Sequence, residues 1–397
     1  MAERARHRVP EHVGPRTAIA LVQVLGLAVW FSASAVAPAL REEWGLDTVS
    51  AVALTVSVQM GFVVGAVGSA VLTLADRLRP HRLLAGSALG AATATLLLAC
   101  VESAGPALAL RGLTGLFLAG VYPVGMKLTT SWSRRGSRGR DLGLLIAALT
   151  LGSTLPHLLG GLALPWRWLL VGAAGAAVLA ALVSVAAVRP GPGHAPAPPP
   201  DRRYAVDLLR DRTARLVVFG YLGHMWELYA FWTWLPSYLE AASPDLPVHL
   251  VAFVTAGLAG AVGCVVAGRA ADRWGPVPIA VLALAASGTC CLLSPTMVDA
   301  SPAGLAVFCA VWGATVIADS GLFTAALSDV ADPRYVGTAL TTQTALGFLL
   351  TAVSIPVVAL AADLTDWRFA LLVLLPGPVL GVWSLRALLP RRVTLEA

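Results

Sequence analysis

Three charged residues stand inside long apolar runs of this sequence, and they are the first candidates for chemistry. Arg111, Glu227 and Asp319 each have mostly apolar or small neighbours on both sides. A charged side chain at the centre of a bilayer costs about 2.5–3.5 kcal/mol on insertion scales, so such residues usually face a cavity and pair with another group. We therefore expect these residues to belong to a functional site.

Glu227 has a histidine close by in sequence. His224 precedes it by three residues, which places both side chains on one face of a helix. A neighbouring imidazole and carboxyl group can pass a proton between them, and burial favours the uncharged form of a carboxyl group. We predict that Glu227, Asp319 and His224 carry protons. The alternative for either acid is a hydrogen bond between helices.

Aromatic and polar side chains recur at helical spacing around these charges. Trp312 and Phe323 share a face with Asp319, and Tyr122 shares a face with Arg111. Such groups suit a flat or amphipathic organic solute, and the alternative is ordinary packing between helices. The predicted solute-binding residues are Arg111, Tyr122, Trp30, Gln59, His157, Trp226, Tyr229, Phe231, Trp312 and Phe323.

The composition is that of a membrane protein. Hydrophobic residues make up 57% of the chain and charged residues 13%, with a mean hydropathy of +0.76, whereas a soluble domain has about 25% charged residues. The five cysteines all lie in apolar runs without ligand spacing and are expected to pack rather than to bind metal. No phosphate-binding loop is present, so we expect that ATP is not the energy source. We also predict that the chain is not an enzyme and needs no cofactor.

Apolar runs long enough to cross a bilayer, which needs roughly 20 residues, recur along the chain. We predict an all-α membrane protein with twelve transmembrane helices. They are expected at about 17–38, 49–74, 82–101, 106–131, 142–163, 168–188, 214–239, 248–268, 276–297, 302–328, 336–361 and 367–389.

The basic residues orient these helices. With the N-terminus inside, 23 of the 28 lysines and arginines fall on the inner side and three on the outer side. This is the positive-inside pattern, so we expect a bacterial inner-membrane protein with both termini cytoplasmic. The net charge of +6 then reflects topology, and nucleic acid is not an expected partner. Lys127, near the inner end of its span, is expected to extend to lipid headgroups.

A Pro- and Gly-rich segment divides the chain. Residues 189–213 cannot form a core and are predicted to be a cytoplasmic linker, with a short interfacial helix over 204–212. It separates six-helix halves at 17–188 and 214–389, and short cytoplasmic tails are expected at 1–16 and 390–397. An Asp-Arg turn occurs once in each half, at Asp76-Arg77 and Asp272-Arg273, which suggests pseudo-symmetric halves.

These features together resemble the major facilitator superfamily. Its loop motif, Gly-x-Leu-Ala-Asp-Arg-x-Gly, is matched in the second half by Gly268, Ala271, Asp272, Arg273 and Gly275. The first copy departs from the motif, with Leu72 and Arg79 in place of the two glycines.

The resemblance also implies roles for individual residues. In this family the Asp and Arg of the motif help to lock the cytoplasmic gate, a role carried over to Asp76, Arg77, Asp272 and Arg273. The alternative is a solvated turn whose charges only set topology. Arg111 is similar to an arginine of the family's fourth span. The segment from Gly143 to Gly161 resembles the antiporter pattern of span 5, with Pro156-His157 in place of Gly-Pro.

The predicted function is secondary active transport of a small organic solute by alternating access, coupled to protons. The expected partners are the solute, protons and the lipid bilayer, and a monomer is expected. Drug/proton antiport is one alternative, and an uncoupled facilitator or a sensor on the same scaffold is another. The aromatic residues of span 7 favour efflux, whereas Arg111 and Lys127 favour an anion that is imported. The identity of the solute does not follow from the fold.

Overall fold

The fold is helical throughout the described part of the chain. The computed structural model describes residues 14–160, 165–195, 198–199, 201 and 203–389, and every regular element in them is a helix. Of the predicted tails, residues 1–13 and 390–397 lie outside the described residues.

The helices before the predicted linker are α1 Pro15–Leu27, α2 Ser32–Ala35, α3 Ala37–Trp44, α4 Thr48–Val71, α5 Leu74–Arg77, α6 Pro80–Leu98, α7 Ala104–Leu118, α8 Tyr122–Trp132, η1 Arg135–Ser137, α9 Arg138–Gly160 and α10 Trp166–Ala187. Those after it are α11 Tyr204–Arg210, α12 Arg212–Ala242, α13 Val248–Ala252, η2 Phe253–Ala259, α14 Gly260–Trp274, α15 Pro276–Met297, α16 Pro302–Val316, α17 Ser320–Val330, α18 Val336–Leu364, α19 Trp367–Ala370, η3 Leu371–Leu374, α20 Pro376–Leu385 and η4 Arg386–Leu388.

Eight helical segments within the described residues are long and apolar enough to cross a membrane. They are Val52–Val71, Ala104–Trp132, Trp166–Ala187, Val248–Trp274, Pro276–Met297, Pro302–Val330, Val336–Leu364 and Trp367–Leu388. Helices α6, α9 and α12 occupy three further predicted spans but are not among the eight. The chain is therefore a multi-pass membrane protein.

Several of the predicted spans are not single continuous helices. The expected span 17–38 contains α1, which ends at Leu27, and the short α2 and α3. The expected span 106–131 is interrupted between α7 and α8, and 302–328 is interrupted between α16 and α17. The latter two interruptions correspond, because α17 begins 198 residues after α8 and Asp272 follows Asp76 by 196 residues.

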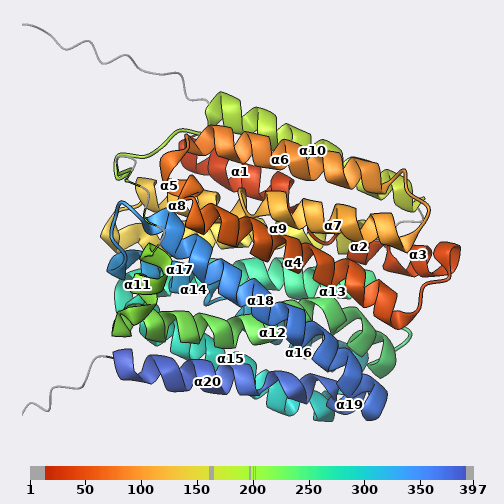
Figure 1. Cartoon of the computed structure of the whole chain (residues 1–397). Helices are drawn as coiled ribbons and strands as arrows, with labels where there is room; N and C mark the ends of the chain where they lie inside the picture. Colours follow the sequence, from red (N-terminus) through yellow and green to blue (C-terminus); the bar gives the residue numbers. More distant parts are fainter. Residues whose placement is uncertain (1–13, 161–164, 196–197, 200, 202, 390–397) are drawn as a thin grey trace, which may run out of the picture.

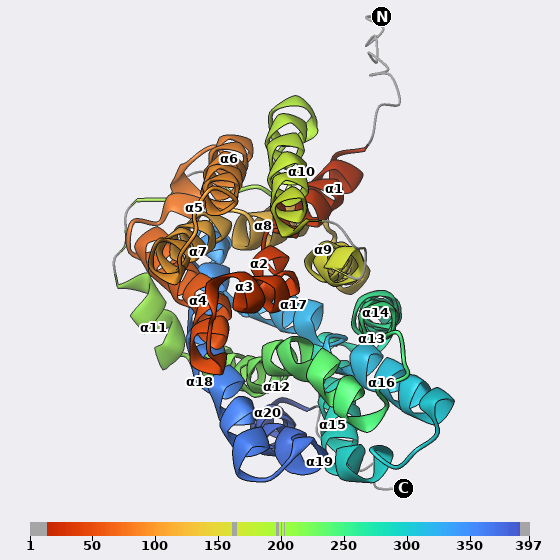
Figure 2. The ribbon, with the colours of Figure 1, turned by 90° about the vertical axis from the view of Figure 1, so that its right-hand side faces the viewer.

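The helices run side by side along the length of the molecule (Figure 1). Viewed end-on, α1 to α10 gather towards one side and α12 to α20 towards the other (Figure 2). Helix α4 lies beside α18, and α9 lies beside α14, where the two groups meet. We call the end of the molecule that carries α5, α11 and the predicted linker the linker face, which is at the left of Figure 1.

Close helix contacts rest on glycine. A Cβ atom on Gly115 of α7 would lie 1.9 Å from the Val58 carbonyl oxygen of α4, and one on Gly268 of α14 would lie 2.4 Å from the Gly139 oxygen of α9. Small residues of this kind allow helices in a membrane to approach closely. In the first motif copy Leu72, which stands in place of the motif's first glycine, is 49% exposed. The motif's last glycine, Gly275, adopts φ +88°, a conformation that favours glycine.

The linker is hydrogen-bonded to both helix groups. Trp132 Nε1 at the end of α8 donates to the Arg189 oxygen at 2.8 Å, and Tyr335 Oη before α18 donates to the Pro199 oxygen at 3.0 Å. The rings of Tyr204 and Tyr335 stack with centroids 4.5 Å apart. The predicted interfacial helix is present as α11, which ends at Arg210.

Candidate functional site

A buried histidine and a buried aspartate meet at the interruption between α16 and α17. His224 Nδ1 lies 2.8 Å from Asp319 Oδ1, and each side chain is 1% exposed. His224 Nε2 is 2.7 Å from the hydroxyl of Ser320, the first residue of α17. Asp319 lies in the turn where α16 has ended, so the interruption brings both Asp319 and Ser320 to one imidazole.

Glu227 occupies a separate polar site one turn along α12. Its carboxyl group accepts hydrogen bonds from Trp312 Nε1 at 2.7 Å, from Ser287 Oγ at 2.9 Å and from Cys291 Sγ at 3.2 Å. These donors lie on α15 and α16, so Glu227 is bound within the second helix group. The structure therefore pairs His224 with Asp319 and gives Glu227 other partners, although His224 and Glu227 share a helix face.

Several predicted solute-binding residues have structural partners. Trp312 donates to Glu227, and its ring packs against Phe231 with centroids 4.6 Å apart. Trp226 Nε1 donates to the Val373 oxygen at 2.9 Å, next to α20. Phe323 packs against the His224 ring at 5.6 Å. The contacts of Trp312, Phe231 and Phe323 connect these residues with the two acid sites, whereas Trp226 binds elsewhere.

Arg111 binds backbone rather than carboxylate. It is fully buried, and its guanidinium donates to the Val29 oxygen at 3.0 Å, to the Leu54 oxygen at 3.4 Å and to the Trp30 oxygen. Val29 and Trp30 follow the end of α1, where carbonyl groups lack helical partners. Arg111 thus stabilises the interruption of the first predicted span. Among the described residues it has no ion-pair partner.

A cluster of aromatic rings fills the space between the two helix groups. The Trp30 ring lies 4.8 Å from Phe348 of α18, 5.4 Å from Phe62 of α4 and 5.8 Å from Tyr229 of α12, measured between centroids. Phe31 packs in turn against Trp232 at 5.9 Å. Predicted residues Trp30 and Tyr229 therefore meet across the interface of the two groups.

Five buried polar side chains near this cluster have atoms without a hydrogen-bond partner in the described part of the protein. They are Trp30, Gln59, Tyr221, Trp232 and Gln343, and none is more than 2% exposed. Trp30 and Gln59 are predicted site residues, but sequence reasoning did not select Tyr221 and Gln343. Two signals were available: Tyr221 lies three residues before His224, and all three glutamines of the chain lie in apolar runs.

Two predicted residues add little to this geometry. Tyr122 is 5% exposed and begins α8 directly after the interruption that separates it from α7. His157 lies in α9, but its side chain is outside the described part of the structure.

At the linker face, Asp76 connects the two helix groups. Its Oδ1 atom lies 2.7 Å from Lys127 Nζ of α8 and accepts a hydrogen bond from Gly337 N at 2.9 Å. Its Oδ2 atom accepts from Thr338 N and from Thr338 Oγ1, each at 2.7 Å. A carboxylate is favoured at the N-terminus of a helix, here α18. The expectation that Lys127 extends to lipid headgroups is wrong, because Lys127 is buried against Asp76.

Asp272, in the second helix group, makes the corresponding connection to the first group. Its carboxylate accepts hydrogen bonds from Gly139 N at 2.8 Å and from Arg140 N at 3.2 Å, at the N-terminus of α9. The two motif aspartates therefore each bind a helix of the opposite group. Arg77 and Arg273 are both exposed, and Arg273 lies 5.2 Å from the centroid of the Trp274 ring.

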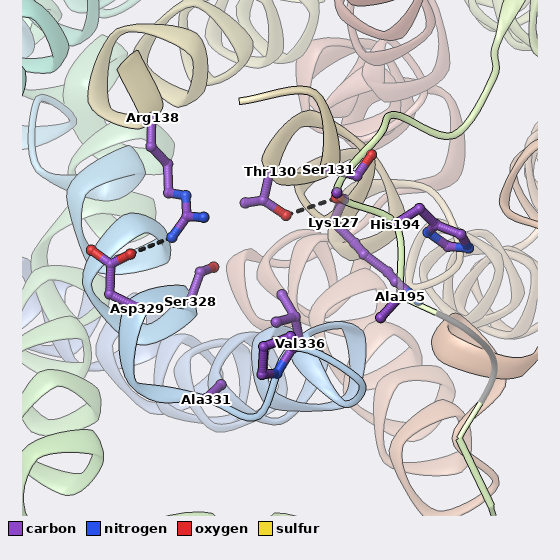
Figure 3. Close-up of a pocket in the computed structure, with 12 residues that line it drawn as sticks. Lys127, Thr130, Ser131, Arg138, His194, Ala195, Ser328, Asp329, Ala331 and Val336 are labelled. Carbon is purple, nitrogen blue, oxygen red and sulfur yellow. Dashed lines mark hydrogen bonds and ion pairs between the residues drawn. The ribbon is translucent and has the colours of Figure 1, made fainter. Parts of the chain in front are cut away.

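A pocket of about 370 Å³ lies beside the Asp76–Lys127 pair, among α8, α9, α17, the start of α18 and the linker (Figure 3). Arg138 of α9 forms an ion pair with Asp329 of α17 across this pocket, and Thr130 Oγ1 donates to the Lys127 oxygen. In the loop beside it, a hydrogen bond from Arg334 lowers the pKa of the Asp332 carboxyl group. Charged contacts between the groups are thus concentrated at the linker face.

The described residues contain no cluster of three or more His, Cys, Asp or Glu side chains that could hold a metal ion. Residues 19–355 match the model of the Major Facilitator Superfamily. The chain belongs to this family, and its family and similar proteins make it a membrane transporter and not an enzyme.

Two proteins that are similar to this chain are named as transporters. A gentisate transporter of Corynebacterium glutamicum is 24% identical over an alignment of 279 residues that covers 64% of this chain. The match covers 60% of the relative's own length. The crystal structure of the human organic anion transporter MFSD10 (TETRAN) has a TM-score of 0.74 at 20% sequence identity, covering 94% of this chain and 98% of that one. This second likeness shows the fold.

Proposed function

We propose that the protein is a proton-coupled secondary active transporter that moves a small organic solute by alternating access. Twelve transmembrane helices form two six-helix halves, at residues 17–188 and 214–389, joined by the linker 189–213. The protein acts as a monomer in the bacterial inner membrane, with the linker face and both termini in the cytoplasm. Family membership and the placement of the helices support this proposal.

The observation that carries the coupling proposal is the contact between His224 and Asp319. Both are buried at a helix interruption, where protonation changes the balance of charge between α12 and the turn before α17. A charged pair and a partly protonated pair differ in their electrostatic attraction, and a low dielectric enlarges that difference. Proton binding at this pair therefore changes how tightly α12 and the α16–α17 segment are held together. Glu227 is the second proton carrier in this scheme.

The motif aspartates serve as the gate at the linker face. Asp76 and Asp272 each bind the N-terminus of a helix in the opposite group, so movement of the halves apart breaks both sets of hydrogen bonds. Two separate sets of contacts at one face let that face close firmly while the other face opens, as alternating access requires. In this scheme Arg77 and Arg273 contribute to the same gate.

The solute binds between the halves, among Trp30, Tyr229 and their neighbours. The relatives are named for gentisate and for organic anions, and these names guide the choice of solutes to test. Arg111 favours an anionic solute, because its guanidinium group places a positive charge next to Trp30. Arg111 therefore favours import of an anion over efflux of a cationic drug.

The test uses protein reconstituted in liposomes that contain a pH-sensitive dye. Addition of gentisate is expected to produce a solute-dependent proton flux, and Asp319→Asn is expected to lower it roughly tenfold or more. Asp363→Asn is the matched control, because Asp363 is an exposed acid near the end of α18. Solute movement without proton flux would replace this proposal with an uncoupled facilitator. A panel of organic acids and cationic drugs that all fail to move would favour a sensor.

A further inference from the structure

Tyr221 and Gln343 are buried polar residues with atoms that no other described residue satisfies. Tyr221 is 2% exposed and Gln343 is 1% exposed, and neither Tyr221 Oη nor Gln343 Nε2 has a hydrogen-bond partner in the described protein. Burial of an unsatisfied polar group costs about 1–3 kcal/mol in general. Two such groups in one region therefore require an explanation other than packing.

The two residues lie on facing surfaces of α12 and α18. A Cβ atom on Gly347 of α18 would lie 2.5 Å from Tyr221 Cε1, so the Tyr221 ring rests directly on that helix. Gln343 precedes Gly347 by four residues, which places it one turn away on the same face. Tyr221 and Gln343 thus border the same space, next to the interface of the helix groups.

This space adjoins the proton pair. The Tyr221 ring lies 5.9 Å from the His224 ring and 5.8 Å from the Phe323 ring, between centroids. His224 in turn contacts Asp319. A ligand that binds Tyr221 would therefore lie close to His224, which belongs to the pair proposed to carry the proton.

The unsatisfied atoms around the aromatic cluster are mainly hydrogen-bond donors. Trp30 Nε1, Gln59 Nε2 and Gln343 Nε2 can only donate, and the Tyr221 hydroxyl can donate as well. Among the unsatisfied atoms of these four residues, only Gln59 Oε1 is restricted to accepting. Hydrogen bonds to an ionised acceptor are about twice as strong as those between neutral groups. The donors therefore favour an anionic ligand with several acceptor atoms.

Charge and shape point to the same ligand. Arg111 carries a buried positive charge on the Trp30 backbone and has no ion pair in the described chain, so it attracts an anion. The rings of Trp30, Phe62 and Phe348 lie within 5.4 Å of one another and provide surfaces for a flat group. A planar ring with one carboxylate matches both features.

We propose that Tyr221 and Gln343 bind the carboxylate of a small aromatic acid whose ring packs against the edge of the cluster formed by Trp30, Phe62 and Phe348. This inference rests on the proposed transport function, since it names the solute class of that site. It adds two binding residues and places the carboxylate beside His224. The solute and the proton are then recognised by adjacent groups.

The test measures binding to the purified full-length protein in detergent, by calorimetry at one fixed pH. Benzoate and gentisate are expected to bind, and benzamide, which has the same ring without the charge, at least tenfold more weakly. Cyclohexanecarboxylate, which keeps the charge without the aromatic ring, is expected to bind more weakly than benzoate. Equal affinity for benzoate and benzamide, or no binding by either acid, would overturn the proposal.

Two variants test the residues. Tyr221→Phe and Gln343→Leu are each expected to weaken benzoate binding about tenfold or more, and to change benzamide binding less. The preference for benzoate then falls, which a purely structural role of these residues would not cause. Benzoate affinity equal to that of the unsubstituted protein in both variants would contradict the assignment.

Ser354→Ala is the matched control. Ser354 is also buried on α18 with an unpartnered hydroxyl, but it lies eleven residues beyond Gln343, or about 16 Å along the helix. Its substitution is expected to leave benzoate affinity unchanged. If a site variant unfolds, the comparison of benzoate with benzamide on the unsubstituted protein still decides the ligand class.

Failure of this inference can be told apart from failure of the proposed function. The binding measurement uses no membrane and no proton gradient, so benzoate can bind even if transport is not proton-coupled. Conversely, proton flux driven by a solute without a carboxylate would support the transport proposal and overturn this one.

Discussion

Asp76 and Lys127 form a buried ion pair at the linker face. Asp76 Oδ1 lies 2.7 Å from Lys127 Nζ, and the two side chains are 0% and 6% exposed. The same carboxylate accepts hydrogen bonds from the first residues of α18. One side chain therefore satisfies a buried cation and joins the two helix groups.

We predict that Asp76→Asn destabilises the protein strongly, because Lys127 is left as an uncompensated buried charge. Loss of one partner of a buried pair costs about 3–5 kcal/mol. Thermal unfolding of the purified protein in detergent measures the effect. The double variant Asp76→Asn, Lys127→Met is expected to recover part of the loss, since it removes the unpaired cation.

Asp272→Asn is the comparison for that experiment. Asp272 has no ion pair among the described residues and accepts only the amide hydrogen bonds of Gly139 and Arg140. Its substitution is expected to cost about 1–3 kcal/mol. Equal losses in Asp76→Asn and Asp272→Asn would show that Lys127 does not depend on its partner.

A second prediction concerns His224. His224→Gln removes the imidazole that contacts Asp319 and is expected to lower proton-driven solute accumulation roughly tenfold or more. Exchange of solute across liposomes without a gradient is expected to continue, because the solute-binding residues remain. Ser320→Ala, which removes only the hydroxyl next to Nε2, should have a smaller effect. Accumulation at the unsubstituted level in His224→Gln would contradict a role in coupling.

A third prediction follows from the geometry of Arg111. Arg111→Lys keeps the charge but loses the planar set of donors that reaches the oxygens of Val29, Trp30 and Leu54. Each carbonyl left without a donor costs about 1–3 kcal/mol. Both the unfolding temperature and the initial rate of solute uptake are expected to fall.

Arg368→Lys is the control for Arg111→Lys. Arg368 forms an ion pair with the exposed Asp299 at 2.6 Å. Exposed ion pairs contribute little to stability, so uptake and unfolding temperature are expected to stay close to the unsubstituted values. A similarly small effect of Arg111→Lys would show that the charge alone is needed at that position.

A fourth prediction tests the close contact of α4 and α7. Gly115→Ala would place a Cβ atom 1.9 Å from the Val58 oxygen, so the helices must move apart. Overpacking of this kind costs about 1–3 kcal/mol. Gly86→Ala in α6 is the control, because its Cβ atom would have no neighbour within 4 Å. Alanine favours a helix more than glycine does, so we expect Gly86→Ala to be neutral or slightly stabilising in thermal unfolding. A larger loss of stability in Gly86→Ala than in Gly115→Ala would contradict this account of the packing.

A fifth prediction addresses the linker. Trp132→Phe removes the indole hydrogen bond to the Arg189 oxygen and keeps an aromatic ring. A typical hydrogen bond contributes about 0.5–1.5 kcal/mol, so trypsin cleavage within the linker is expected to become about 2–12-fold faster. Trp168→Phe is the control, because Trp168 is 67% exposed at the start of α10. Unchanged cleavage in Trp132→Phe would show that this bond does not hold the linker.

The sequence by itself determined the class of protein and the residues that needed partners. The apolar composition, the Asp-Arg turns at Asp76 and Asp272 and the charged residues Arg111, Glu227 and Asp319 are all visible without coordinates, because a polar residue in an apolar run stands out from its neighbours. Helical periodicity also placed Phe323 beside Asp319. These features depend on residue type and local spacing alone.

The tertiary structure decided which partners these residues have. His224 contacts Asp319 rather than Glu227, Lys127 pairs with Asp76, and Arg111 binds backbone oxygens. Periodicity gives the face of a helix on which a side chain lies, but it does not specify the neighbouring helix opposite that face. Packing between distant segments decides where the helices are interrupted before Tyr122 and Ser320. It also leaves Gln343 Nε2 without a hydrogen-bond partner among the described residues. Only the assembled helices reveal these features.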